Sequence, residues 1–299
     1  MLASVKALLS SVVDYAGLFP PAKLNMGEAM ANYAQDQKAP DSWMLGRFVV
    51  PASRLNELEK LVPTLGLNQW SLSVILSRDV ELEIDWLRSF HNTNQIAIAS
   101  LEIPPLPPPE IERVFPRLPA GIDSFFEIPL NKDLDAYLAV LQQIGASAKV
   151  RTGGIAADAF PSVTQLSQCI CAFAEARVPF KATAGLHHPL PANHRVTYEP
   201  NSPSTVMHGF LNVAIAAALV YWQKITPEEV PEVLQTSSSD RFQFQDDGIG
   251  WSVKRSYPLG NRQLSIAQIE EARQQFFRSF GSCSFQEPID DLKHLKLLS

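Results

Sequence analysis

Cysteine is scarce in this chain of 299 residues, which holds only Cys169, Cys171 and Cys283. Three cysteines cannot form a disulfide framework, and the spacing of Cys169 and Cys171 is not that of a zinc-ligand pair. Buried free thiols in a reducing compartment are the simpler interpretation, because unpaired cysteine behaves as a small apolar side chain. We therefore expect no disulfide bonds and a cytoplasmic protein.

The chain also lacks an excess of positive charge and any long apolar run. Its 25 lysines and arginines against 31 aspartates and glutamates give a net charge of −6. Such a balance excludes nucleic acid as the main partner, because phosphate binding needs a basic surface. The apolar run that ends at Val13 is shorter than a signal-peptide core, and Val213–Trp222 is too short to span a bilayer. We expect no membrane partner, and the oligomeric state stays open.

No Gly-x-Gly-x-x-Gly sequence follows the first expected strand, so a dinucleotide site on an open, doubly wound sheet has no support. The chain instead repeats a unit of one strand followed by one helix. Apolar strands recur at intervals of about 25–30 residues, each followed by a helical pattern. This alternation implies a parallel sheet with right-handed crossovers, and seven consecutive units favour a closed barrel. The sequence predicts an α/β fold, a single TIM-like (β/α)8 barrel.

Seven strands of this barrel are clear from their apolar content and the turn residues that follow them. They are expected at Ser11–Tyr15, Met44–Val50, Trp70–Leu76, Ile96–Ile103, Ser124–Ile128, Lys149–Thr152 and Phe180–Thr183. We place the eighth strand at Arg241–Gln245 and its closing helix at Ser265–Ser279. The barrel is thus expected over residues 1–279, with residues 280–299 as a C-terminal extension packed on it.

Charged side chains share one face of the later strands. Side chains alternate along a strand, so Lys149 and Arg151 point to one side, as do Lys181 and Thr183. Glu127 occupies the matching position on the fifth strand. The alternation places this charged set inside the barrel, at the strand ends where the active sites of such barrels lie. Two further charged candidates near strand ends are Arg47 and Glu102.

Lysines on adjacent strands would lie close together, because neighbouring strands are about 4.8 Å apart. Two ammonium groups in a partly desolvated site depress each other's pKa, and burial acts in the same direction. A lysine driven toward the neutral amine can form a Schiff base with a carbonyl compound. Lys149 and Lys181 are the candidates for this chemistry, and Glu127 is a candidate proton carrier.

The loop after the sixth strand supplies groups that suit an anion. Arg151 can hold a carboxylate or phosphate by forked hydrogen bonds, and the backbone amides of Gly153 and Gly154 can form an anion nest. Together with Thr152 and Thr183, these residues form the expected substrate contacts. The expected partner is therefore a small anionic substrate.

Two loops complete the set of candidates. His187 and His188 directly follow the seventh strand and can act as acid, base or substrate contact. Asp14 and Tyr15 end the first strand and can add an acid and a hydroxyl. Cys283 would need a nearby base to act as a nucleophile, and the sequence shows none, so its segment is read as a lid or end cap.

The two lysine strands resemble those of class I aldolases of the deoxyribose-phosphate aldolase type. Lys149-Val150-Arg151-Thr152-Gly153 is similar to the Lys-x-Ser/Thr-Thr-Gly strand that carries the Schiff-base lysine in that family. Phe180-Lys181-Ala182-Thr183-Ala184-Gly185 is similar to the next strand, whose lysine perturbs the first. The resemblance implies Lys149 as the Schiff-base former and Lys181 as its modulator. It covers two strand–helix units and departs from the family at Arg151 and at the two histidines.

The whole chain also resembles a family of bacterial proteins that share two sequence segments. The resemblance to this family implies no particular activity. The segments are Asp-Tyr-Ala-Gly-Leu-Phe-Pro-Pro-Ala, from residue 14, and Phe-Lys-Ala-Thr-Ala-Gly-Leu-His-His-Pro, from residue 180.

Three functions remain open on the sequence. The first is a Schiff-base aldolase or lyase that acts on a small anionic carbonyl compound without a cofactor. The second is a metal-dependent hydrolase or isomerase that uses His187 or His188 with Glu127. The third is a non-catalytic barrel that binds a small anion, in which Lys149, Arg151 and Lys181 form the receptor. A purely structural alternative is a salt-bridged layer of Glu127 with the two lysines that closes the barrel without chemistry. Buried ion pairs stabilise poorly compared with apolar layers, which favours a functional site.

Overall fold

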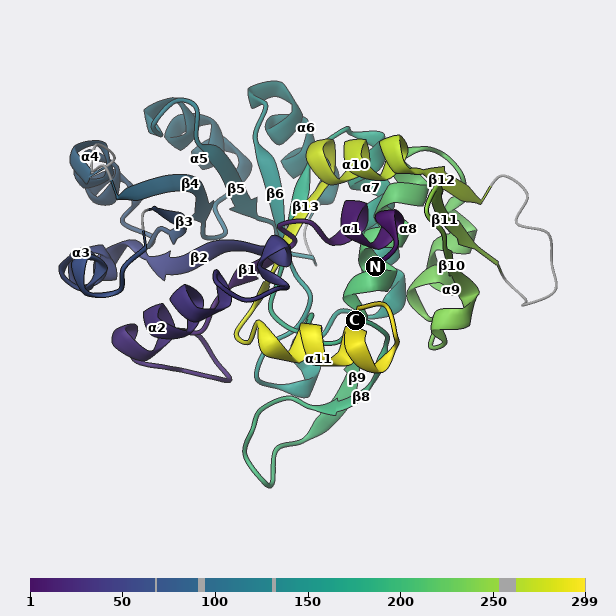
Figure 1. Ribbon diagram of the computed structural model, residues 1–299. Coiled ribbons are helices and arrows are strands. Elements are labelled where there is room, and N and C mark those ends of the chain that lie inside the picture. The colour runs from purple at the N-terminus through teal and green to yellow at the C-terminus, as the bar shows by residue number, and fades with distance from the viewer. Residues whose placement is uncertain (68, 91–94, 131–132, 253–261, 299) are drawn as a thin grey trace.

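The computed structural model describes residues 1–67, 69–90, 95–130, 133–252 and 262–298. Eight parallel strands close into a barrel, and helices surround it (Figure 1). In chain order the barrel strands are β1 (Val13–Tyr15), β2 (Leu45–Pro51), β3 (Trp70–Ile75), β4 (Ile96–Ile103), β5 (Asp123–Glu127), β6 (Ser147–Arg151), β7 (Phe180–Thr183) and β13 (Phe277–Ser282). The predicted (β/α)8 barrel is confirmed.

One helix follows each of the first six strands. These helices are α2 (Met26–Asp36), α3 (Leu55–Leu61), α4 (Val80–Phe90), α5 (Pro108–Val114), α6 (Leu134–Ile144) and α7 (Val163–Glu175). Local sequence sets their ends. Asn25 starts α2 and Ser162 starts α7, each with a reciprocal capping box, while Gly145 ends α6 in the left-handed conformation at φ 69°.

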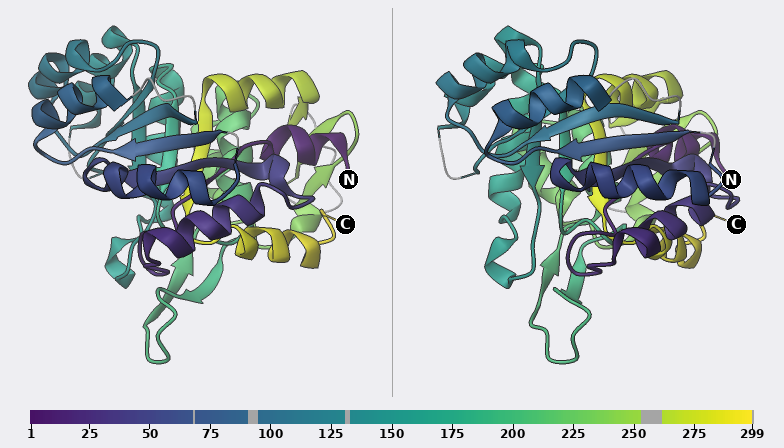
Figure 2. Two further views of the ribbon diagram at one scale, coloured as in Figure 1. Left: turned by 60° about the vertical axis from the view of Figure 1, so that its left-hand side comes forward. Right: turned by 90° about the vertical axis from the view of Figure 1, so that its left-hand side faces the viewer.

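A longer insertion separates the seventh strand from the eighth. It begins with a hairpin of β8 (Ala192–Arg195) and β9 (Ser204–Met207), which projects from the barrel (Figure 2). The helices α8 (Phe210–Tyr221), α9 (Val230–Leu234) and α10 (Ile266–Gln275) follow. Helix α8 is buried over residues 210–219, because α7, α9 and α10 pack around it. Within the described residues, no helix is both long and apolar enough to cross a membrane.

The remaining elements flank the barrel. Helix α1 (Ala3–Leu9) precedes β1, and α11 (Gln286–His294) follows β13 as the C-terminal extension. Short 3-10 helices lie at Ser42–Met44, Ala52–Arg54, Val62–Thr64, Phe115–Arg117, Ala157–Ala159, Pro227–Glu229 and Ser239–Arg241.

The eighth barrel strand is β13, so its predicted position at Arg241–Gln245 was wrong. That segment contains β10 (Phe242–Phe244), which pairs in an antiparallel sheet with β11 (Gly248–Trp251), and β11 pairs with β12 (Gln263–Ser265). Its alternation of apolar and polar residues is the pattern of a half-exposed antiparallel strand. Residues 280–282 thus lie in the barrel, and the extension starts after them.

The centre of the barrel is polar, whereas such barrels are usually filled by branched apolar side chains. Among the described residues, the buried polar side chains that point inward include Asp14, Ser73, Ser100, Glu102, Lys149, Lys181 and Ser279. The apolar core lies between the barrel and its helices. An aromatic cluster of Tyr15, Tyr33, Phe48 and Trp70, for example, joins α2 to the first three strands.

Candidate active site

The strand register brings the predicted charged residues together. Lys149 on β6 lies opposite Glu127 on β5 and opposite Lys181 on β7. All three side chains point into the barrel, as the alternation of side chains predicts. They form two layers, one at the barrel centre around Lys181 and one nearer the C-terminal mouth around Lys149.

Lys181 forms the deeper layer. Its Nζ lies 2.5 Å from Asp14 Oδ2 and 2.7 Å from Glu102 Oε1, and it lies 5.5 Å from the centre of the Phe125 ring. Burial lowers the pKa of Lys181, but the carboxylates of Asp14 and Glu102 outweigh burial and raise it above its usual value. The expectation that its pKa is depressed was wrong for this lysine, because the sequence did not reveal how many carboxylates surround it. Lys181 is therefore a fixed cation.

Glu102 joins the two layers. Its Oε2 lies 3.1 Å from Lys149 Nζ, while Oε1 accepts hydrogen bonds from Lys181 and from the Ser73 hydroxyl at 2.7 Å. Ser100 in turn donates to Ser73. Burial raises the pKa of Glu102, but the two ammonium groups prevail and hold it far below its ordinary range. Glu102 therefore stays ionised and fixes both lysines.

Asp14 is the second fixed anion of the deeper layer. Its Oδ2 accepts from Ser279 at 2.6 Å and its Oδ1 accepts from the backbone N–H of Arg47 at 3.0 Å. Burial raises the pKa of Asp14, but the charges of Lys181 and Arg47 lower it below its usual value. Asp14 thus supports Lys181 from below and does not reach the mouth.

Lys149 forms the outer layer with Glu127 and Arg151. The Nζ of Lys149 lies 2.9 Å from Glu127 Oε2, and Glu127 Oε1 lies 3.4 Å from the Nε of the half-exposed Arg151. Burial raises the pKa of Glu127, but Lys149 and Arg151 lower it below its ordinary value. The amine of Lys149 therefore has a carboxylate within direct proton-transfer distance.

A cavity of about 610 Å³ opens above this layer at the mouth of the barrel. Of the predicted site residues it is lined by Glu102, Glu127, Lys149, Arg151, Gly153, Gly154, Thr183 and His187. Lys149 borders the cavity and Lys181 does not, so the two lysines differ in their access to a ligand. Apolar walls come from Phe19, Pro20 and Ile155. The volume suits a small organic molecule.

The loops after β6 and β7 form one wall of this cavity. A Cβ atom at Gly153 would lie 2.5 Å from Phe160 Cε1 and 2.8 Å from Gly185 Cα, so the close approach of the loops requires glycine. Thr152 is buried and donates its hydroxyl to Ala184 O at 2.5 Å, so it ties the loops together outside the cavity. Within the described ranges, no intramolecular hydrogen bond uses the backbone N–H of Gly153 or Gly154. These donors are thus available to an anion.

Two further predicted site residues, Arg47 and Tyr15, lie outside the mouth cavity. Arg47 stands near the start of β2, at the opposite end of the barrel, where it is paired with Asp123 at 3.2 Å. Tyr15 is buried in the aromatic cluster, where its hydroxyl accepts a hydrogen bond from Asn32. The structure brings neither side chain to the mouth cavity.

His187 belongs to a cluster at the rim of the cavity. Its Nδ1 lies 3.5 Å from Glu287 Oε2, and Tyr198 donates to Glu287 Oε1 at 3.0 Å and lies 3.5 Å from Cys283 Sγ. Burial lowers the pKa of His187, but contacts with Cys283 and Glu287 raise it to about 9. The sequence did not reveal His187 as a base near Cys283. Cys283 directly follows the eighth barrel strand, which was predicted at another position in the chain.

His188 points away from the lysines. Its Nδ1 lies 2.6 Å from Asp291 Oδ2 on α11, and its ring stacks on that of His194 with centroids 3.5 Å apart. His187 lines the mouth cavity together with Glu127, whereas His188 does not line it. In the part of the chain that the structure describes, no three His, Cys, Asp or Glu side chains form a group that could hold a metal ion.

No family model, curated protein or solved structure matches this chain. The fold and the site define its class: an eight-stranded α/β barrel whose centre holds a lysine–carboxylate network beneath a mouth cavity. Such a fold is compatible with a small-molecule enzyme.

Proposed function

We propose that this protein is a Schiff-base lyase of the class I aldolase type, which acts on a small anionic carbonyl compound. One observation carries the proposal: the amine of Lys149 borders the mouth cavity, 2.9 Å from the carboxylate of Glu127. A nucleophilic amine needs access to the substrate and a base that accepts its proton, and Lys149 has both.

The reaction begins when Glu127 accepts a proton from the Lys149 ammonium group. The free amine attacks the carbonyl carbon and forms a carbinolamine, which loses water to give an iminium ion. A base then takes the proton of the hydroxyl group on the β carbon, and the bond between the α and β carbons breaks. Its electron pair moves to the positive nitrogen, which leaves an enamine and releases the β carbon as an aldehyde. Protonation of the enamine and hydrolysis return the amine and the second product. Glu127 is placed to move the protons of these steps.

The anionic group of the substrate is proposed to bind on the far side of the cavity. Arg151 offers a half-exposed guanidinium group, and the amides of Gly153 and Gly154 offer two further donors. Forked contacts of this kind hold a carboxylate or phosphate in one orientation. Arg151 can release Glu127 to take the substrate, because its contacts with that carboxylate, 3.4 Å and 3.5 Å, are long.

The charged groups of the deeper layer stay ionised below the reacting amine of Lys149. Lys181 and Glu102 are buried and paired, so neither is free to accept or release protons during the reaction. Lys181 is proposed to act as a positioning residue that holds Glu102 against Lys149. This assignment keeps the division of roles that the resemblance to class I aldolases implies.

Borohydride trapping tests the proposal. The protein is incubated with a panel of keto acids and aldehydes, reduced, digested and mapped by mass spectrometry. We expect a secondary-amine adduct at Lys149 with at least one small anionic carbonyl compound. Lys149→Arg is the matched control, because it keeps the positive charge beside Glu102 and Glu127 but cannot form the adduct.

The results separate the Schiff-base lyase from the non-catalytic anion binder. No adduct at Lys149 across the panel contradicts the proposal, and an adduct at Lys181 alone reverses the roles of the two lysines. Thermal stabilisation by the same anions that is lost in Arg151→Ala, without any adduct, would instead support the non-catalytic binder.

A further inference from the structure

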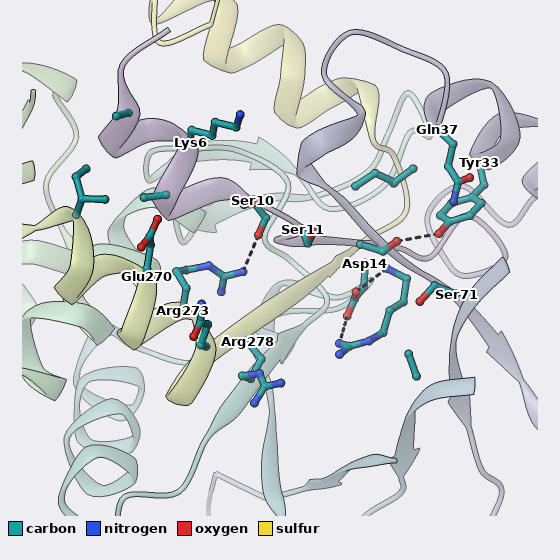
Figure 3. Close-up of a pocket in the computed structure, with 18 residues that line it drawn as sticks. Lys6, Ser10, Ser11, Asp14, Tyr33, Gln37, Ser71, Glu270, Arg273 and Arg278 are labelled. Carbon is teal, nitrogen blue, oxygen red and sulfur yellow. Dashed lines mark hydrogen bonds and ion pairs between the residues drawn. The ribbon is translucent and has the colours of Figure 1, made fainter. Parts of the chain in front are cut away.

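We propose that the end of the barrel opposite the mouth holds a second binding site, for a small dianion with phosphate or carboxylate groups. A cavity of about 830 Å³, the basal pocket, opens there between the first residues of the strands and helices α1 and α10 (Figure 3). Its size lies in the range of pockets that bind small organic ligands. The inference does not depend on the chemistry at Lys149, because the two cavities lie at opposite ends of the barrel.

Two arginines of the basal pocket compete for one carboxylate. Arg47 Nη2 lies 3.2 Å from Asp123 Oδ2, and Arg278 Nη2 lies 2.9 Å from the same oxygen. Both side chains are partly exposed to the pocket. A single carboxylate oxygen neutralises one guanidinium charge, so one positive charge of this group is left for a ligand.

A third arginine, Arg273, has hydrogen-bond acceptors for only some of its donors. Arg273 donates from Nη2 to Ser10 O at 3.3 Å and from Nη1 to Phe277 O, and Figure 3 shows its guanidinium group reaching toward Ser10. Both acceptors are neutral carbonyl groups, and its Nε is buried without a hydrogen-bond partner. Burial and the nearby charges of Arg278 and Arg47 lower the pKa of Arg273 to about 9, although Asp14 opposes this effect. An anion in the pocket would relieve the repulsion between these cations.

The charge balance of the pocket indicates a dianion. Asp14 Oδ2 also lies 3.8 Å from Arg47 Nη1, but Lys181 at 2.5 Å already balances its charge, so Asp14 does not count toward the balance. Among the described residues Lys6 forms no ion pair, and it lines the pocket from α1 (Figure 3). The remaining groups are the cations Lys6, Arg47, Arg273 and Arg278 and the carboxylates Asp123 and Glu270. Two positive charges are in excess, and guanidinium groups recognise phosphate and carboxylate oxygens with high geometric specificity.

An alternative role for these arginines is to hold the base of the barrel together without a ligand. That role explains the contacts of Arg47 and Arg278 with Asp123, but it does not explain the open cavity beside them. The two roles differ in whether an anion binds.

Calorimetric titration with inorganic phosphate at pH 8, and in parallel with succinate, tests the proposal. The titration uses the Arg151→Gln protein, in which the main anion contact of the mouth is removed. We expect one bound anion per chain, and an affinity that falls about tenfold or more when Arg273→Gln or Arg278→Gln is added. The exposed Lys6→Gln should weaken binding about threefold, and Lys60→Gln, an exposed lysine outside the pocket, should not change it.

Comparison of the two titrants distinguishes a phosphate site from a carboxylate site. Absence of binding by both anions at millimolar concentration would overturn the proposal, as would binding that neither Arg278→Gln nor Lys6→Gln weakens. Lys6→Gln keeps the test decisive if an arginine variant fails to fold, because Lys6 is exposed on α1.

Discussion

Glu102→Gln is the most informative single change, because it removes one charge from the centre of the network and leaves the side-chain volume unchanged. Two ammonium groups, those of Lys149 and Lys181, lose the carboxylate that they share at 3.1 Å and 2.7 Å. Loss of one partner from a buried ion pair typically costs about 3–5 kcal/mol in the free energy of unfolding. At roughly 2 °C per kcal/mol for a chain of this length, the melting temperature should fall by about 6–10 °C.

The assay is urea unfolding at pH 7, followed by tryptophan fluorescence and circular dichroism. Glu102→Gln combined with Lys149→Met serves as the matched control, because it removes one negative and one positive charge together. We expect the double variant to be at least as stable as Glu102→Gln alone, since the excess positive charge is gone and each remaining charge keeps a partner, Lys181 with Asp14 and Glu127 with Arg151. A loss of less than about 1 kcal/mol in Glu102→Gln would refute the reasoning, because such a loss is typical of a solvent-screened pair.

The pH dependence gives a second check on the same variant. The pKa of Glu102 is lowered in the folded protein relative to its ordinary value of 4.5. The contribution of Glu102 to the free energy of unfolding is therefore fully present above about pH 4.5. It is lost as the pH falls toward the pKa that Glu102 has in the folded protein. The stability gap between the natural protein and Glu102→Gln should narrow in acid. A gap that widens in acid would contradict the assigned charge states.

Two further changes test the mouth of the barrel. His187→Gln should lower the free energy of unfolding on the order of 2 kcal/mol near pH 6, and this loss should vanish above pH 9. The reason is that the neighbours of His187 stabilise only its protonated form, which raises its pKa to about 9. Urea titrations at the two pH values measure the loss, and a loss that does not depend on pH would exclude this cause. Gly153→Ala should cost about 1–3 kcal/mol in the same assay, because its Cβ would meet Phe160 and Gly185. Gly27→Ala on α2, where a Cβ has room, should not destabilise the protein, and equal losses in both variants would contradict the packing argument.

Local periodicity was sufficient to predict most of the barrel. The strands Ile96–Ile103 and Phe180–Thr183 have the predicted bounds, because each is an apolar run that ends at turn residues. The alternation of side chains along two such strands also placed Lys149 beside Lys181. These features depend on short stretches of sequence, so they could be predicted without knowledge of the whole fold.

The eighth strand and the partners of Lys181 could not be predicted in this way. Strand β13 carries Arg278, Ser279 and Ser282 and has phenylalanine at only two of its six positions, so it lacks the apolar signature of its neighbours. Asp14 and Lys181 are 167 positions apart and meet only because the barrel closes. Local patterns contain no information about a contact between such distant residues.

The position of β13 between β1 and β7 also determines when the site can exist during synthesis. Strand β13 emerges from the ribosome after the other seven strands, and it is the neighbour that both β1 and β7 require. Until residues 277–282 are available, the sheet has two open edges, and Asp14 and Lys181 stand on opposite ones. The ion pair that anchors the network therefore forms in the last step of assembly, so a nascent chain that lacks this strand carries every charged residue of the mouth without an organised site.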